Sequence, residues 1–256
     1  QILGMLKIPA LRLKGGYRAY RKYVHQTLSC YRIKPEIVVL NGLTGVGKTA
    51  IIKQLLLQGY PAIDLEELAH HRGSVFGAVG FAGHRSQKDF ESLLLIELNK
   101  FQTSPYLVLE GEGSRIGHLH LPRFLTQAIQ EGVHILVTAP LNLRAERILQ
   151  EYLSPGLSAE NLSQIKQGLI SLENRLGKTR TARLLDLLQK GDYHTLVQEL
   201  CTDYYDRLYK DSKPERQEFA AILEAGQIAE ASGQLIEFLN RRYLKSYLPQ
   251  KEDVFI

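Results

Sequence analysis

One glycine-rich octapeptide constrains the fold of this chain more than any other feature. The pattern G-x-x-x-x-G-K-[ST] is filled at every fixed position by Gly42-Leu43-Thr44-Gly45-Val46-Gly47-Lys48-Thr49, which begins one residue after the apolar run 37–40. A helical pattern follows at 49–58 and ends at Gly59. Strand, loop and helix in this order predict a P-loop, in which backbone amides and a helix N-terminus surround phosphate oxygens.

The residue types of this loop suit phosphate binding. Glycine adopts the positive φ angles that let successive amides point at one phosphate. Lys48 is expected to be catalytic by neutralising the distal phosphates, and the Thr49 hydroxyl is expected to bind Mg²⁺. The expected phosphate-binding residues are Gly42, Thr44, Gly45, Val46, Gly47, Lys48, Thr49 and, further along the chain, Arg144. The alternative, a glycine-rich turn without a ligand, is disfavoured by the strand and helix on either side.

The composition is that of a globular protein. The 256 residues are 44% hydrophobic, which is enough for a buried core. No apolar run approaches the roughly 18 residues of a membrane span, and no sequence resembling a signal peptide opens the chain, so a cytoplasmic location without a membrane partner is expected. The net charge of +5 is weak evidence for a polyanionic partner. Cys30 and Cys201 are expected to be reduced and structural.

Strand and helix patterns alternate along the chain. Continuous apolar strands are predicted at 37–40, 62–65, 106–110, 133–139 and 219–223, and amphipathic helices at 49–58, 86–101 and 227–243. This alternation predicts an α/β fold: a P-loop NTPase of the kinase-like type, with a parallel five-stranded sheet and helices on both faces. The helical pattern at 141–213 predicts a lid-like insertion between the fourth and fifth strands.

Acidic residues end two of the predicted strands. Asp64 and Glu66 follow the second strand, and Glu110 and Glu112 follow the third, at the sheet edge where this fold binds ligands. Glu110 is expected to join Thr49 in the shell of a Mg²⁺ ion, because carboxylate and hydroxyl oxygens suit that cation. Asp64 is expected to be catalytic. For both acids the alternative role is to cap or stabilise a helix N-terminus.

The loop 70–77 is dense in hydrogen-bond donors. Arg72 is expected to be catalytic, because a guanidinium group can bind phosphate in a bidentate way. His71 and Ser74 are expected to contact RNA or the lid. The alternative for all three residues is a plain surface loop.

Basic residues recur in the predicted insertion. Besides Arg144 and Arg147, we expect contacts to RNA or within the lid from Arg175, Lys178 and Arg180. Arginines on a closing lid can stabilise phosphate charge. A basic track would instead suit an RNA backbone, with bases stacked on three nearby tyrosines, Tyr204, Tyr205 and Tyr209. The third alternative is a solvated helix face.

Signatures of other P-loop classes are absent from the sequence. The chain has no Asn-Lys-x-Asp tetrad, no Leu-Ser-Gly-Gly-Gln segment and no Asp-Glu box after the third strand. These absences argue against an ordinary GTPase, a transporter ATPase and a helicase. The remaining candidates for its function are a small-molecule kinase and a P-loop domain adapted to another phosphorylated ligand.

Three further segments carry a distinctive combination of motifs. They are Asp64-Leu65-Glu66 running into the loop 69–77 (A-H-H-R-G-S-V-F-G), Gln87 with Phe90-Glu91, and the segment 110–117 (E-G-E-G-S-R-I-G). Together they resemble the P-loop domain of bacterial tRNA 2-selenouridine synthases, over most of residues 36–243. That family usually has acids where this chain has Gly111 and Gly113, which weakens the case for a metal in this loop.

The opening of the chain fits the same family. Residues 11–21 (L-R-L-K-G-G-Y-R-A-Y-R) resemble the closing strand, turn and helix of the rhodanese domain that precedes the P-loop domain in these synthases. The resemblance implies a rhodanese remnant at 1–25, a linker at 26–35 and a P-loop domain at 36–256. Rhodanese chemistry needs a low-pKa cysteine, and neither cysteine of this chain has suitable surroundings. We therefore expect a fragment whose catalytic cysteine lies upstream and which can be inactive alone.

The resemblance implies a transferase that replaces sulfur by selenium at the wobble 2-thiouridine of tRNA. Its substrates would be selenophosphate and geranyl diphosphate, with an S-geranyl intermediate, Mg²⁺ at the P-loop and ATP as a further possible ligand. The implied partners are tRNA and the upstream rhodanese domain. Two alternatives stay open: a small-molecule kinase that uses ATP with Asp64 as the base, and a non-catalytic RNA-binding module.

Overall fold

A parallel sheet forms the centre of the molecule. A computed structural model describes residues 12–81, 83–111, 113–153, 158–212 and 218–243. Within these ranges a four-stranded sheet has the order β2-β1-β5-β6, made of β1 (Glu36–Asn41), β2 (Tyr106–Glu110), β5 (Val133–Thr138) and β6 (Ala221–Glu224). Every strand pair in it is parallel. The predicted α/β class with a parallel sheet is confirmed.

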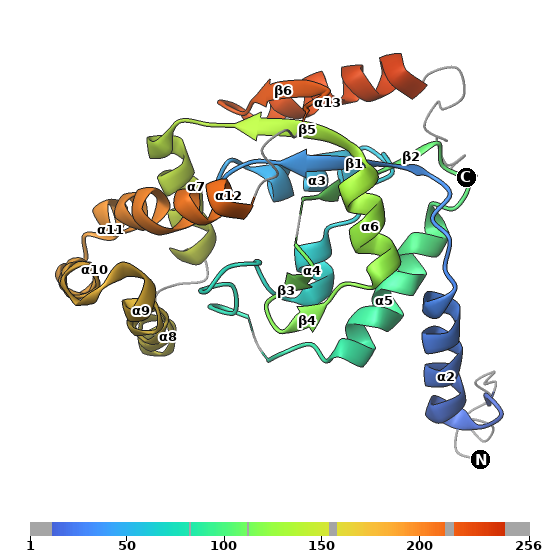
Figure 1. The fold of residues 1–256 in the computed structure, drawn as a ribbon, viewed down its shortest axis with the longest axis horizontal. Helices are drawn as coiled ribbons and strands as arrows, with labels where there is room; N and C mark the ends of the chain where they lie inside the picture. Colours follow the sequence, from blue (N-terminus) through green and yellow to red (C-terminus); the bar gives the residue numbers. More distant parts are fainter. Residues whose placement is uncertain (1–11, 82, 112, 154–157, 213–217, 244–256) are drawn as a thin grey trace, which may run out of the picture.

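Helices cover both faces of this sheet (Figure 1). One face carries α3 (Lys48–Leu57) and α13 (Ile228–Tyr243), and the other carries α5 (Gln87–Lys100) and α6 (Arg123–Glu131). Successive residues of a strand point to opposite faces. Val38 and Leu40 of β1 accordingly pack with the first pair of helices, and Ile37 and Val39 pack with the second. Burial on both faces explains why β1 and β2 are continuously apolar.

The prediction of a fifth strand at 62–65 is wrong for the described residues. This segment contributes only an isolated parallel bridge between Ala62 and Val108. The chain turns into helix α4 (Leu65–Ala69) because Asp64 caps it, accepting a hydrogen bond of 2.8 Å from the Glu67 amide. The cap ends the extended segment before it can form a ladder.

A short antiparallel pair, β3 (Arg115–Ile116) and β4 (Leu119–His120), follows β2 and was not predicted. Gln87 joins this pair to α5, because its side chain donates to the His120 carbonyl and accepts from the His120 amide, each at 2.9 Å. The motif residue Gln87 therefore has a structural role.

The described residues between β5 and β6 are mainly helical, as predicted. They are α7 (Leu141–Leu153), α8 (Ala159–Ser171), α9 (Glu173–Leu176), α10 (Lys178–Lys190), α11 (Tyr193–Leu200), the π-helical turn η1 (Cys201–Tyr205) and α12 (Asp206–Ser212). Figure 1 shows this insertion beyond the carboxyl ends of β1 and β5. It has its own apolar core, which includes the buried Leu169, Leu184 and Leu200.

Helix α2 (Gly16–Ser29) precedes the sheet and packs on α5. Val24 and Leu28 contact Leu95 in a small apolar cluster, and Arg21 forms an ion pair with Glu91. The helix continues beyond residue 25, where the rhodanese remnant was expected to end, and residues 1–11 lie outside the described ranges. The division into domains stays a prediction. Among the helices in the described part of the chain, none has the length and hydrophobicity that a membrane span requires.

Candidate phosphate-binding site

The P-loop connects β1 to α3 with its backbone tightly enclosed. Gly42 has a φ of 154°, and a Cβ at this position would lie 2.4 Å from the Val137 carbonyl oxygen. Gly47 has a φ of 102° and is the N-cap of α3. Because Gly47 has no side chain to bond the first amides of α3, the N-terminus of this helix is open to a phosphate group.

Lys48 lies along the loop that it follows. Its ammonium group donates hydrogen bonds to the carbonyl oxygens of Gly42 at 2.9 Å and Leu43 at 3.4 Å. Both acceptors are neutral, so a phosphate oxygen would be a stronger partner for this cation. Residues 42–49, which we call the cradle, therefore have a positive charge beside their backbone. Their binding of phosphate stays a prediction.

Thr49 faces a carboxylate. Its hydroxyl donates a hydrogen bond of 3.2 Å to Oε2 of Glu66, which follows the Asp64 cap in α4. Mg²⁺ is commonly held by one or two protein oxygens together with phosphate oxygens, so this pair suits the ion. Glu110, the other expected ligand, ends β2 with only 1% of its surface exposed. Glu112 lies outside the described residues, and the part of the chain that is described holds no cluster of three or more His, Cys, Asp or Glu suited to a metal.

Asp64 is buried beside α3. One of its oxygens caps α4, and the other lies 3.9 Å from the Lys53 ammonium group. Burial raises the pKa of the Asp64 carboxyl, although the Glu67 amide and Lys53 act in the opposite direction. The capping role that was the alternative for Asp64 is present, and its catalytic role stays a prediction.

Two arginines of α7 hold the P-loop in place. Nε of the buried Arg144 donates to the Thr44 carbonyl at 2.8 Å, while its terminal nitrogens bond both carboxylate oxygens of Asp206. Arg147 donates to the Val46 carbonyl at 2.8 Å and to the Gly226 carbonyl at 3.0 Å. The Arg144 guanidinium thus contacts the loop that it was expected to assist, but through a backbone carbonyl and with its charge paired.

Side-chain hydrogen bonds join the loop after α4 to α7. Arg72 donates to Glu151 and to the Val79 carbonyl, both at 2.7 Å, and lies over the rings of Phe81 and Tyr152. Ser74 bonds the Tyr152 hydroxyl at 3.1 Å. The contact of Ser74 with α7 is consistent with the prediction that Ser74 contacts RNA or the lid. A role for Arg72 in catalysis stays a prediction.

His71 packs against two glycines. A Cβ at Gly77 would lie 2.5 Å from the His71 ring, and one at Gly117 would lie 2.8 Å from it. Burial lowers the pKa of His71, and the nearby His118, His84 and Arg72 lower it further. His71 therefore joins the loop to the β3–β4 pair, and a contact with RNA stays a prediction.

The remaining predicted basic residues lie on the outer part of the insertion. Arg175, Lys178 and Arg180 are exposed, and Arg180 lies 3.5 Å from Asp203. Figure 1 places α9 and α10 on the side of the insertion away from α3. Tyr204 is buried in the core of the insertion, so it does not offer its ring for base stacking.

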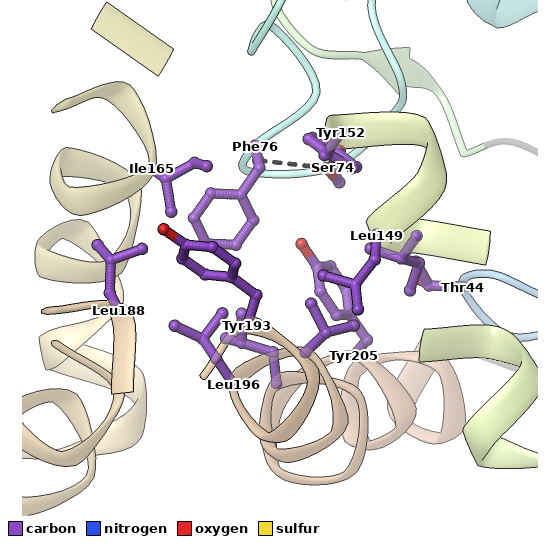
Figure 2. A pocket seen from close by; sticks show the side chains of 13 residues that line it. Thr44, Ser74, Phe76, Leu149, Tyr152, Ile165, Leu188, Tyr193, Leu196 and Tyr205 are labelled. Carbon is purple, nitrogen blue, oxygen red and sulfur yellow. Dashed lines mark hydrogen bonds between the residues drawn. The ribbon is translucent and has the colours of Figure 1, made fainter. Parts of the chain in front are cut away.

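An apolar cavity of about 70 Å³ lies among the helices of the insertion and the loop after α4. Figure 2 shows side chains from the loop after α4, from α7 and from α11 converging on it. Thr44 of the P-loop forms part of its wall, together with Phe76, Leu149 and Leu196. The cavity and the phosphate cradle are therefore neighbours.

Comparison with known proteins identifies the family. A family model described as the tRNA 2-selenouridine synthase AAA domain matches residues 35–242. The chain belongs to the tRNA 2-selenouridine synthase family. Curated relatives with the name tRNA 2-selenouridine synthase include proteins from Cupriavidus pinatubonensis, 32% identical over 80% of this chain, and Pseudomonas syringae pv. tomato, 34% identical over 90% of it. The family predicted from the motifs is thus confirmed.

The chain spans 62% of the length of the Cupriavidus synthase and 68% of that of the Pseudomonas synthase. Among solved structures, a gluconokinase from Sinorhizobium meliloti is similar with a TM-score of 0.36 and 15% identity, over 84% of this chain and 99% of that one. The structure of TT1252 from Thermus thermophilus has a TM-score of 0.35 and 16% identity, over 82% of this chain and 98% of that one.

Three residues that contact the P-loop or its partner Arg144 were not predicted from the sequence to do so. Arg147 holds the Val46 carbonyl, Asp206 pairs with Arg144, and Tyr209 hydrogen-bonds the backbone of Gly42 while burial raises its pKa to about 12. The spacing of Arg144 and Arg147 places both on one face of a helix, which is the only local signal for this arrangement. Asp206 and Tyr209 have the same spacing in α12, but they lie far along the chain, and the spacing does not indicate that they meet the P-loop.

Proposed function

We propose that this chain is the phosphate-binding part of a tRNA 2-selenouridine synthase. In this proposal the cradle holds a phosphorylated substrate while the wobble 2-thiouridine of a tRNA is converted to 2-selenouridine. The observation that carries the proposal is the open N-terminus of α3 with Lys48 beside it, in a chain of this family. Selenophosphate and geranyl diphosphate are the substrates that we propose.

The cradle suits the departure of a diphosphate. In the proposed first step the uridine sulfur forms a bond to C1 of the geranyl chain, and the C1–O bond breaks. The electron pair of that bond goes to the leaving diphosphate, and the N3 proton of the base passes to water or a nearby base. Backbone amides and the Lys48 ammonium group would stabilise the charge that develops on the diphosphate oxygens.

The oxygen atoms of Thr49 and Glu66 would hold a magnesium ion next to these phosphates. Such an ion would supply further neutralisation of phosphate charge. The selenium atom of selenophosphate would then form a bond to C2 of the base as the geranyl thiolate leaves and takes up a proton, and water would cleave the Se–P bond and release phosphate. We also retain the prediction that α2 belongs to the end of an upstream rhodanese domain.

Binding to Lys48 variants tests the cradle. The loss of a charge-assisted hydrogen bond is worth about 1.5–3 kcal/mol, so we expect Lys48→Ala to weaken binding of geranyl diphosphate and pyrophosphate by at least about tenfold in calorimetry. Lys190→Ala is the matched control, because Lys190 is an exposed lysine of α10 paired with Asp186. Unchanged binding in Lys48→Ala would overturn the assignment.

A kinase is the second candidate, and the buried Asp64 is the observation that favours it. A carboxyl with a raised pKa beside a P-loop could accept a proton from an acceptor hydroxyl. Release of ADP from ATP in the presence of a hydroxyl acceptor, without modification of 2-thiouridine tRNA as measured by nucleoside mass spectrometry, would establish the kinase instead.

A further inference from the structure

We propose that helix α2 binds the phosphate backbone of the RNA substrate, through a stripe of exposed residues that leads into a groove between α2 and α6. The α2 stripe consists of Arg18, Lys22, His25 and Ser29. This inference rests on the proposed function, because it takes the RNA to be the tRNA that is modified. It adds a docking surface that lies outside the phosphate cradle.

Positive charge is concentrated at the start of the chain. Residues 1–34 contain eight lysines and arginines and no aspartate or glutamate, whereas the whole chain has 32 basic and 27 acidic residues. Residues 35–256 therefore carry a net charge of −3. Because a surface of one sign attracts a polyanion, the beginning of the chain is where RNA should dock.

The spacing of the α2 stripe places its members on one side of the helix. Residues 18, 22, 25 and 29 are separated by four, three and four positions, a spacing that follows one face of an α-helix. All four residues are exposed. Two cations and two hydrogen-bonding groups thus form a row along which one RNA strand can lie.

The two cations of the stripe have no acidic partner within the described ranges. Neither Arg18 nor Lys22 forms a salt bridge there. In the insertion, by contrast, Arg180 and Arg183 each pair with an acid. A phosphate group would therefore compete with a carboxylate on α10 but not on α2, which favours α2 as the RNA surface.

A polar groove of about 460 Å³ lies between α2, α5 and α6. Helix α2 contributes His25 and Ser29 of the stripe to its lining, and α6 contributes Arg123 and Gln127. Among the described residues that line it, Glu91 is the one acid, and its charge is already paired with α2. Guanidinium, amide and hydroxyl groups commonly bind phosphate and sugar in nucleic-acid complexes, so the groove extends the stripe.

A membrane surface is the less suitable partner. A helix that lies on a membrane buries an apolar face among the lipids. In α2 the apolar Val24 and Leu28 are already buried against Leu95 of α5. The exposed aromatic residues of α2, Tyr17 and Tyr23, carry hydroxyl groups that can bond phosphate. The helix therefore offers charge and hydrogen bonds rather than an apolar face.

Helix α2 and the cradle lie at opposite ends of β1 (Figure 1). The helix precedes this strand and the P-loop follows it, and the six residues of the strand span roughly 20 Å. A ligand that contacts both surfaces must therefore be large, as a folded RNA is. Loss of the stripe should accordingly weaken RNA binding and leave phosphate binding in the cradle unchanged.

Binding of an unmodified tRNA transcript to the whole chain tests the inference, measured by fluorescence anisotropy over a range of KCl concentrations. Each lost phosphate contact lowers the salt dependence of log affinity by about one. We expect Arg18→Ala/Lys22→Ala to lower it by about two and to weaken binding at least about tenfold in 0.1 M KCl. Pyrophosphate affinity should stay within about twofold. Arg18→Lys/Lys22→Arg keeps both charges and should keep the salt dependence.

Lys190→Ala/Arg241→Ala is the matched control. It also removes two positive charges, from exposed residues of α10 and α13. Its salt dependence should equal that of the unmodified chain. Equal salt dependence in this control and in Arg18→Ala/Lys22→Ala would overturn the inference and leave the proposed function intact.

Three other outcomes would also contradict the docking surface. A larger loss of tRNA affinity in Arg175→Ala/Lys178→Ala would place the RNA on the insertion instead. Binding to phosphatidylserine vesicles that depends on Arg18 and Lys22, while tRNA binding does not, would assign the stripe to a membrane. Absence of tRNA binding to the unmodified chain would overturn the proposed function and this inference with it.

Discussion

Arg144 and Asp206 form a bidentate ion pair beside the P-loop, with nitrogen to oxygen distances of 2.6 and 3.0 Å. Arg144 is 3% exposed and also holds the Thr44 carbonyl, so the pair links the insertion to the phosphate cradle. Because a buried arginine without its partner is costly, both stability and ligand binding should depend on Asp206.

We expect Asp206→Ala to lower the free energy of unfolding by about 3 kcal/mol in urea denaturation, since it leaves the Arg144 charge buried and unpaired. Pyrophosphate affinity should fall as well, because Asp206 no longer holds the Arg144 guanidinium in position to bond the Thr44 carbonyl. Glu237→Ala is the control: its exposed pair with Arg241 should be worth no more than about 0.5 kcal/mol. Equal stability of the two variants would show that the buried pair is unimportant.

Gly42→Ala should distort the P-loop. The new Cβ would meet the Val137 carbonyl oxygen at 2.4 Å, a backbone atom that cannot move aside without disturbing β5. We expect a loss of about 2 kcal/mol in the free energy of unfolding and a loss of pyrophosphate binding. Gly233→Ala, in the interior of α13 with open space around its Cβ, should instead stabilise by about 0.5–1 kcal/mol in the same assay. A neutral Gly42→Ala would show that the loop is less constrained than its contacts indicate.

His71 should make stability depend on pH. Its pKa is lowered in the folded state, so the unfolded chain binds the proton more readily. Its contribution is fully present above about pH 6.5, the ordinary histidine value, and is lost as the pH falls from there toward the lowered pKa. We expect the urea midpoint of the unmodified chain to fall between pH 7.5 and 5.5 more steeply than that of His71→Gln. His194→Gln, at an exposed position of α11, should keep the full slope; a slope unchanged in His71→Gln would contradict this account.

Thr49→Ala should remove the response of ligand binding to magnesium. The hydroxyl that bonds Glu66 would be lost, and removal of such a ligand or its partner typically lowers metal affinity by about tenfold or more. The measurement is pyrophosphate affinity with and without Mg²⁺. Thr49→Ser keeps the hydroxyl and should keep the response. If Thr49→Ala retained the full magnesium effect, another group would have to bind the ion.

The P-loop could be predicted from eight consecutive residues because its conformation is local. Glycines at fixed spacing, a preceding apolar strand and a following helix leave few other arrangements. The family was predictable for a similar reason, since its motifs are contiguous. The conformation of residues 62–65 could not be predicted from the local sequence. The apolar pattern favours a strand there, but Asp64 caps a helix that begins one residue later.

The contacts that hold the cradle could not be predicted in the same way. Arg144 and Asp206 are 62 residues apart, and Arg147 and Val46 are 101 residues apart. Their meeting depends on how the insertion packs against the sheet. A basic residue in this insertion therefore gives no sign of whether it faces a phosphate, a backbone carbonyl or water.

The hydrogen bonds from α7 to the P-loop couple the position of the insertion to that of the cradle. Arg144 and Arg147, which hydrogen-bond the loop, belong to a helix that also packs on α11, so a displacement of the insertion should also displace the backbone of the P-loop. A substitution deep in the core of the insertion, such as one at Leu200, should therefore register in binding assays as weakened phosphate affinity. Loss of binding in a variant of this family is accordingly no proof that the altered residue touches the substrate.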